Sequence, residues 1–113
     1  MPAVRTAPAT DARLLGLLQA LADEKRLRIL DVLRGGERCV CELQSTLDMG
    51  QSLLSHHLRS LREAGLVRDR RDGRWVHYSL VPEALAELEG YLGAVRSDVA
   101  AADARTDPRA CAS

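Results

Sequence analysis

The chain has 113 residues, which is enough for one domain with a thin hydrophobic core. It contains no Phe, and only 3% of its residues are aromatic, so Leu, Val and Ala must build most of that core. No run approaches the roughly 18 apolar residues of a membrane span, and the first nine residues lack the apolar segment of a secretion signal. We therefore expect a cytoplasmic protein that does not enter a membrane.

Charge is balanced overall, with 16 basic and 16 acidic residues, but it is unevenly distributed. Residues 51–80 contain six arginines and three acidic residues, whereas residues 81–113 contain three arginines and six acidic residues. All the basic residues except Lys25 are Arg, whose planar group suits forked contacts with phosphate. A charged run is more often a solvated face, so this pattern alone only suggests nucleic acid as a partner.

Hydrophobic periodicity of about 3.6 residues predicts four helices in the first part of the chain. They cover about 10–21, 23–33, 40–47 and 51–64. Thr10 or Asp11 is the expected N-cap of the first helix, and Gly65 is the expected stop of the fourth. The third and fourth helices are joined by a short turn at 48–50, which is typical of a helix-turn-helix.

From residue 67 the period of the hydrophobic pattern changes from about 3.6 residues to two residues. Residues 67–71 and 75–80 are predicted strands, joined by an Asp72-Gly73 hairpin turn. Pro82 opens a last helix whose apolar positions are spaced by three and four residues: Leu85, Leu88, Leu92, Val95 and Val99. This stripe either covers the domain's own core or forms a dimer interface, and its length favours the interface. We expect one domain over residues 10–99, with loose tails at 1–9 and 100–113.

The order of these elements is that of a winged helix-turn-helix, a mainly helical fold with a β-hairpin wing. In such folds the second helix of the motif enters the major groove, and the hairpin reaches the adjacent backbone. Here that second helix is residues 51–64, and its exposed face carries short polar side chains and one cation.

The segment from Cys39 to Leu80 closely resembles the ArsR/SmtB family of bacterial metal-responsive repressors. Three motifs carry the resemblance in order: the box "CVCEL", the helix "SHHLRSLREAGLV" and the hairpin "RDGRWVHYSL". The matching part covers at least residues 23–80, about half of the chain. The resemblance implies a homodimer formed through the first and last helices. It also implies that the dimer binds double-stranded operator DNA over resistance genes.

Matching positions assign the DNA contacts. From the recognition helix the resemblance implies contacts by Gln51, Ser52, Ser55, His56, His57 and Arg59. From the hairpin it implies backbone or minor-groove contacts by Arg70, Arg71 and Arg74. His57 lies one position round the helix from His56, and packing against the wing is its alternative role. His77, on the second strand, is expected to be structural or half-exposed.

Cys39 and Cys41 stand at the start of the third helix, where the helix dipole favours the thiolate form. Soft thiolates select thiophilic ions, and within the family the box points to As(III) or Sb(III) as inducer, with no organic cofactor. Positions i and i+2 of a regular helix point about 200° apart. We therefore expect one ion to take both thiolates only by unwinding the third helix, which would disturb the recognition helix.

The best-known arsenite box of the family has a third cysteine where this chain has Gln44. Arsenite prefers three thiolates, and Cys111 in the C-terminal tail is the only other cysteine. The metal-site prediction is therefore Cys39, Cys41 and Cys111, with the tail folding back or crossing to the partner. Two alternatives stay open: Cys111 is a stray thiol, or glutathione or water supplies the third ligand.

Other inducers and functions are weaker alternatives. The cadmium and lead branch adds cysteines from an N-terminal arm, which has none here, and the zinc branch uses histidines on the last helix, which also has none. A redox or persulfide sensor pairing Cys39 or Cys41 with Cys111 is a further alternative, because a direct Cys39–Cys41 disulfide is expected to be strained. A dithiol reductase needs a CxxC motif and a βαβ pattern, and neither is present, so we do not expect an enzyme.

Overall fold

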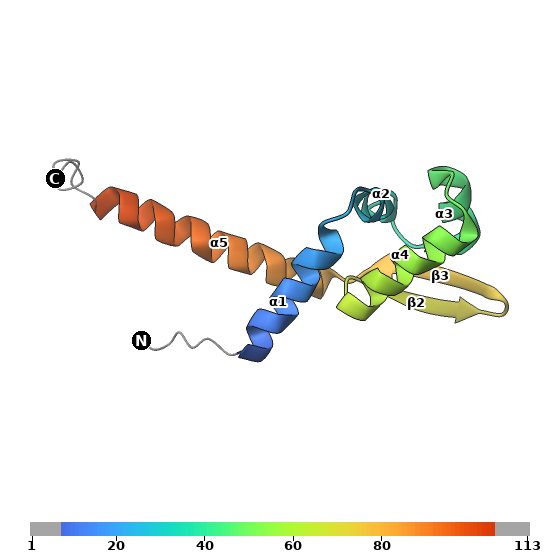
Figure 1. Ribbon diagram of the computed structural model, residues 1–113, viewed down its shortest axis with the longest axis horizontal. Helices are drawn as coiled ribbons and strands as arrows, with labels where there is room; N and C mark the ends of the chain where they lie inside the picture. Colours follow the sequence, from blue (N-terminus) through green and yellow to red (C-terminus); the bar gives the residue numbers. More distant parts are fainter. Residues whose placement is uncertain (1–7, 106–113) are drawn as a thin grey trace.

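The computed structural model describes residues 8–105, which form five helices and three strands (Figure 1). The elements are α1 (Pro8–Leu21), α2 (Glu24–Leu33), β1 (Arg38–Cys39), α3 (Val40–Leu47), α4 (Gln51–Ala64), β2 (Val67–Asp72), β3 (Trp75–Leu80) and α5 (Pro82–Arg105). The predicted order of helices and hairpin is confirmed. Within the described residues, no helix is both long and apolar enough to cross a membrane.

The sheet has three antiparallel strands in the order β1-β3-β2, and its first strand was not expected from the sequence. β1 is only two residues long, too short for a period-two pattern to be visible. It places Cys39 opposite His77, and Arg70 lies opposite His77 on the other side of β3. The third helix therefore begins directly from the edge of the wing.

Local capping explains where the helices begin and end. The Asp23 carboxylate accepts hydrogen bonds from the backbone N–H groups of Lys25 and Arg26, and these bonds hold its pKa below the ordinary value. Asp48 ends α3 in the left-handed conformation with φ 51°, and Gly65 ends α4 with φ 89°. The tight turn between α3 and α4 therefore follows from the residues that fill it.

The core lies between the helices and one side of the sheet, and Leu dominates it as predicted. Its fully buried side chains are Leu17, Ile29, Leu43, Leu54, Leu58, Leu61 and Leu66. Tyr78 from β3 and Met49 from the turn close it. Burying each such side chain contributes roughly 1.5–3 kcal/mol from the removal of apolar surface from water. The recognition helix α4 is thus fixed in position by several large apolar side chains that pack in the core.

The two outer helices differ from the sequence prediction at their ends. α1 begins at Pro8, before the expected cap at Thr10 or Asp11, and α5 continues to Arg105, beyond the expected end near Ala100. The alanine-rich stretch 100–104 has high helix propensity and so extends α5 without needing a core. α1 crosses the first part of α5 (Figure 1), where Arg13 donates hydrogen bonds to both carboxylate oxygens of Glu87, at 2.6 and 2.8 Å.

Candidate DNA-binding face and thiol site

The recognition helix α4 separates its side chains cleanly into two faces. Leu54, Leu58 and Leu61 face the core. Five of the side chains that the resemblance assigned to DNA are exposed on the opposite face: Gln51, Ser52, Ser55, His56 and Arg59. This face can present hydroxyl, amide and guanidinium groups to base edges and phosphates.

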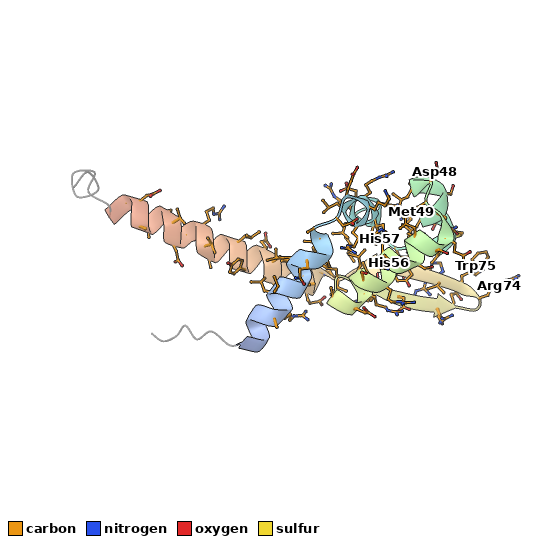
Figure 2. The ribbon with its side chains drawn as sticks, viewed as in Figure 1. Asp48, Met49, His56, His57, Arg74 and Trp75 are labelled. Atoms are coloured by element: carbon orange, nitrogen blue, oxygen red, sulfur yellow. A yellow bond between two sulfur atoms is a disulfide. The ribbon has the colours of Figure 1, made fainter. Side chains whose placement is uncertain are left out.

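His57 differs from the other predicted DNA contacts on α4. Its side chain is only 5% exposed, and it belongs to the buried face of α4, although His56 beside it is exposed (Figure 2). The two rings meet edge to face at 5.2 Å between centroids. Adjacent positions on a helix are about 100° apart, so one of two neighbouring histidines turned inward with the leucines. Burial lowers the pKa of His57, because desolvation disfavours the charged imidazolium.

The three arginines of the wing are all exposed but differ in their partners. Arg70 donates two hydrogen bonds to the Glu37 carboxylate, at 2.8 and 3.1 Å, and these bonds hold the pKa of Glu37 below its ordinary value. Arg71 and Arg74 have no ion pair within residues 8–105. Arg74 lies with Trp75 at the hairpin tip (Figure 2). Arg71 and Arg74 are therefore better placed than Arg70 to accept a new anion.

The two cysteines occupy different kinds of position. Cys39 is the N-cap of α3 and has extended backbone, with φ −77° and ψ 160°, whereas Cys41 lies in the first turn of the helix. The Cys39 Sγ accepts a hydrogen bond from the Glu42 N–H, and the Glu42 carboxylate accepts one from the Cys39 N–H, which completes a capping box. Cys39 is 7% exposed and Cys41 is exposed.

This geometry differs from the regular helix that was assumed for the expected unwinding of α3. Because Cys39 is outside the helix, the 200° separation of helical i and i+2 positions does not apply to the pair. The two sulfur atoms instead meet in a disulfide, and the Cα atoms are 5.4 Å apart, inside the usual range of roughly 4.4–6.8 Å. The structure thus pairs Cys39 directly with Cys41, a pairing that was expected to be strained. The two sulfur atoms are therefore adjacent at the start of α3.

The third predicted ligand, Cys111, lies outside the described residues. Within residues 8–105 no group of three or more His, Cys, Asp or Glu side chains is placed to hold a metal ion. Gln44 lies one helical turn after Cys41, where the arsenite box of the family has its third cysteine. A sulfur ligand for a third position must therefore come from outside this part of the chain.

A cleft of about 410 Å³ opens between α3, α4 and the wing. Cys41 and Gln44 line it from α3, and Gln51 and Ser55 line it from α4. The wing contributes Arg71, Arg74 and Trp75. The exposed thiol position and the predicted DNA-contacting residues thus share one surface depression. The sequence pattern alone did not indicate that Trp75 would border this cleft.

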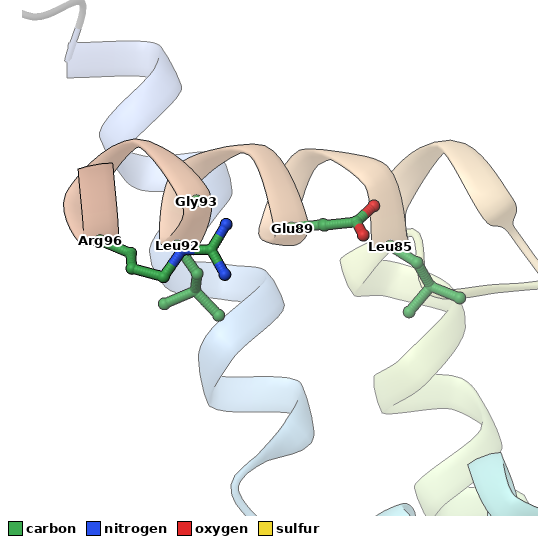
Figure 3. Close-up of a pocket in the computed structure, with 5 residues that line it drawn as sticks. All are labelled: Leu85, Glu89, Leu92, Gly93 and Arg96. Carbon is green, nitrogen blue, oxygen red and sulfur yellow. The ribbon is translucent and has the colours of Figure 1, made fainter.

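A second surface feature lies on α5 and α1. Core burial along α5 ends at Leu88, and the apolar side chains beyond it are exposed: Tyr91, Leu92, Val95 and Val99. α1 adds exposed Leu15 and Leu18. A depression of about 580 Å³ is lined by Leu85, Glu89, Leu92, Gly93 and Arg96, and Leu85 and Leu92 project to the same side of the helix (Figure 3). This apolar face has no covering element within residues 8–105.

Comparison with known proteins places these features in context. The family model described as "Bacterial regulatory protein, arsR family" matches residues 23–69. The chain is 45% identical over 80 residues to an arsenic resistance transcriptional regulator of Pseudomonas putida, covering 70% of this chain and 62% of the relative. It is 52% identical over 67 residues to the arsenical resistance operon repressor of Escherichia coli, covering 58% and 57%. The chain therefore spans about three fifths of the length of these two relatives.

A putative arsenical resistance operon repressor of Halobacterium salinarum is 43% identical over 91 residues, which cover 79% of this chain and 70% of the relative. Relatives named for SmtB and for cadmium resistance also match, so the resemblance is not confined to arsenic regulators. The relatives are regulators, in agreement with the expectation that the protein is not an enzyme.

Solved structures agree with the fold. An ArsR-like transcriptional regulator from Rhodococcus superimposes with a TM-score of 0.77 at 26% identity, covering 85% of this chain and 91% of that one. A homodimeric winged helix-turn-helix DNA-binding domain from Mycobacterium bovis superimposes with a TM-score of 0.66 at 32% identity, covering 80% and 83%. By its sequence and by its fold, this chain belongs to the arsR family of bacterial regulatory proteins.

Proposed function

We propose that the protein is a cytoplasmic repressor that binds operator DNA as a homodimer and releases it when As(III) or Sb(III) binds Cys39 and Cys41. One observation carries the proposal. The two sulfur atoms meet at the start of α3, and Cys41 borders the cleft that Gln51 and Ser55 line from the recognition helix. A thiophilic inducer bound there lies beside the DNA-contacting face.

The exposed apolar face of α1 and α5 supports the homodimer. Leu15, Leu18, Leu92 and Val95 are 38–57% exposed, and a second copy of the same face would remove them from water. A two-fold dimer presents two recognition helices to an inverted repeat. The homodimeric Mycobacterium bovis domain has the same fold, which adds support.

The route of release follows from the position of Cys39. This residue pairs with His77 in the sheet, whereas Cys41 belongs to α3. An atom bonded to both sulfurs therefore links the edge of the wing to the first turn of α3. The bridging atom fixes the distance and the bond angles between the two sulfurs, which two free thiols leave unconstrained. To satisfy this geometry, α3 rotates relative to the wing. α4 follows through the three-residue turn at 48–50, and the recognition helix loses its fit to the groove.

The test is a DNA-binding titration with arsenite for the reduced full-length protein and three variants. Micromolar arsenite is expected to release DNA from the wild-type protein. Cys39→Ser and Cys41→Ser should bind DNA with unchanged affinity but respond at least about a hundredfold less to arsenite, since each removes a covalent ligand. Cys111→Ser reports separately on the tail thiol. Normal release from either of the first two variants would contradict the proposal.

A second candidate function is redox sensing, and the Cys39–Cys41 disulfide specifically favours it. Hydrogen peroxide can oxidise the two thiols to this disulfide with formation of two molecules of water. Addition of peroxide in place of arsenite in the same titration tests the candidate, with mass spectrometry to identify the bonded pair. Release of DNA with a loss of two hydrogen atoms at Cys39 and Cys41 would support it. A disulfide to Cys111 would instead support the other redox pairing.

A further inference from the structure

The cleft beside Cys41 has the size and lining of a small-ligand site. Its volume of about 410 Å³ falls within the range of roughly 300–1,000 Å³ typical of ligand pockets. Trp75 and Val76 give it an apolar wall on the wing side, and Gln44 and Gln51 bring amide groups from α3 and α4. The cleft is open to solvent at the thiol, because the Cys41 side chain is exposed.

The charges that line the cleft favour an anion. Three arginines and one carboxylate face it, and Arg62 is already paired with that carboxylate, Asp69, at 3.3 Å. Arg71 and Arg74 have no ion pair in the part of the chain that the structure describes. Two guanidinium groups are therefore free to bind carboxylates of a ligand in the cleft.

The same cleft borders the position where a sulfur ligand is missing. Arsenic(III) takes three sulfur ligands, and the described residues supply two. The side chain that stands one turn after Cys41 is the amide of Gln44, which also lines the cleft. A molecule in the cleft is thus next to the open coordination position.

We propose that this cleft binds a small anionic thiol of the glutathione class, which supplies the third sulfur to the bound metalloid. This inference rests on the proposed function of Cys39 and Cys41. The ligand's thiol binds arsenic, and its carboxylates bind Arg71 and Arg74. Arsenous acid, two cysteine thiols and one ligand thiol combine to give three arsenic–sulfur bonds and three molecules of water. Arsenic stays in the trivalent state throughout.

The chemistry also requires the cysteine pair to be reduced first. Two molecules of the same thiol class reduce the Cys39–Cys41 disulfide to two thiols and leave as one external disulfide. The adduct then places carboxylates on two arginines that the family resemblance assigns to DNA. Occupation of the cleft therefore opposes DNA binding directly, beside any movement of α3.

The experiment compares two thiols of different charge. Reduced full-length protein, freed of reductant without oxygen, is titrated with arsenite in glutathione or in 2-mercaptoethanol at equal thiolate concentration. Binding is followed by near-ultraviolet arsenic–sulfur absorbance and by Trp75 fluorescence, and native mass spectrometry identifies the adduct. Glutathione should tighten arsenite binding at least about tenfold relative to the neutral thiol, since two charge-assisted contacts are added.

Arginine variants test whether the cleft itself causes the preference for glutathione. The double variant Arg71→Gln/Arg74→Gln should lose the preference. A matched double variant, Arg34→Gln/Arg68→Gln, removes two exposed arginines outside the cleft and should keep it. Equal affinity in the two thiols, or a preference that survives the first double variant, would overturn the inference. So would loss of arsenite binding in Cys111→Ser with no effect of glutathione, because the third ligand would then be Cys111.

The proposed function has a separate failure in the same experiment. If arsenite does not bind the protein in either glutathione or 2-mercaptoethanol, or binds Cys39→Ser as tightly as the wild type, the proposed sensing role of the cysteine pair is wrong. If arsenite binds the pair with no preference between thiols, that role stands and only the cleft inference fails.

Discussion

The two ends of the molecule differ in whether their apolar residues are buried within the chain. At the winged end, α2, α3, α4 and the sheet, with α1 and the first part of α5, enclose a core in which Leu43, Leu54 and Leu61 are fully buried. At the other end, α5 extends away from the rest of the molecule (Figure 1). Apolar side chains beyond Leu88, such as Leu92 and Val99, are more than half exposed. The winged end is complete within one chain, whereas α5 presents an apolar face that residues 8–105 do not cover.

This difference separates stability from assembly. Substitutions in the winged core should act on the folding of each protomer, because the lost contacts lie within it. Substitutions on distal α5 should act on association, because the apolar surface there is removed from water only by a partner. Three experiments can break or sharpen that distinction.

The largest effect is expected from Leu92→Glu on α5. Dimerisation would have to remove a carboxylate in the centre of the apolar face from water, so association should fail. Because two half-sites are then no longer bound together, operator affinity should fall by about a hundredfold or more. Sedimentation and DNA-binding measurements test this, with Ser97→Glu on the opposite side of α5 as the matched control. A dimeric Leu92→Glu protein with normal DNA affinity would contradict the assignment of the face.

The second largest effect is expected from truncating a leucine side chain to alanine, which can be compared at the two ends of the molecule. Leu61→Ala removes a fully buried side chain from the winged core and should lower the free energy of unfolding by about 3 kcal/mol. Leu92→Ala should reduce only the part of the stability that depends on protein concentration. Denaturant unfolding at several protein concentrations measures both. A concentration-independent loss in Leu92→Ala as large as that in Leu61→Ala would mean that the two ends fold as one unit.

The smallest effect concerns the buried titratable group at the winged end. Burial lowers the pKa of His57, so below about pH 6.5 the unfolded chain binds a proton that the folded chain does not. Stability, measured as Tm, should therefore be lost as pH falls from that value towards the folded pKa. His57→Gln should flatten this dependence, and His56→Gln, on the exposed side, should retain it. An unchanged pH profile in His57→Gln would exclude His57 as the source.

The sequence alone determined the elements that local chemistry specifies. Periodicity and turn residues predicted α3, α4 and β3 with their observed bounds, because 3.6-residue and two-residue patterns bounded by Gly and Asp leave little freedom. The same patterns failed where no long period exists, at the two-residue β1, and at the ends of α1 and α5. The position of a helix end depends on helix propensity and capping. The free energies of alternative end positions differ by less than the free energy of packing one side chain in the core.

Only the tertiary structure decided the details of the site. The cysteine pair and the polar face of α4 were recognisable from the sequence. The expected conflict between the two thiolates, however, assumed helical geometry at Cys39, which precedes the predicted helix, and His57 was expected to contact DNA. Pairing of β1 with β3 keeps Cys39 outside α3 and brings its sulfur to Cys41, and the core draws His57 inward. The cleft of Cys41, Arg71 and Trp75 joins elements that are far apart in the sequence, and such proximity follows from packing, which no local pattern encodes.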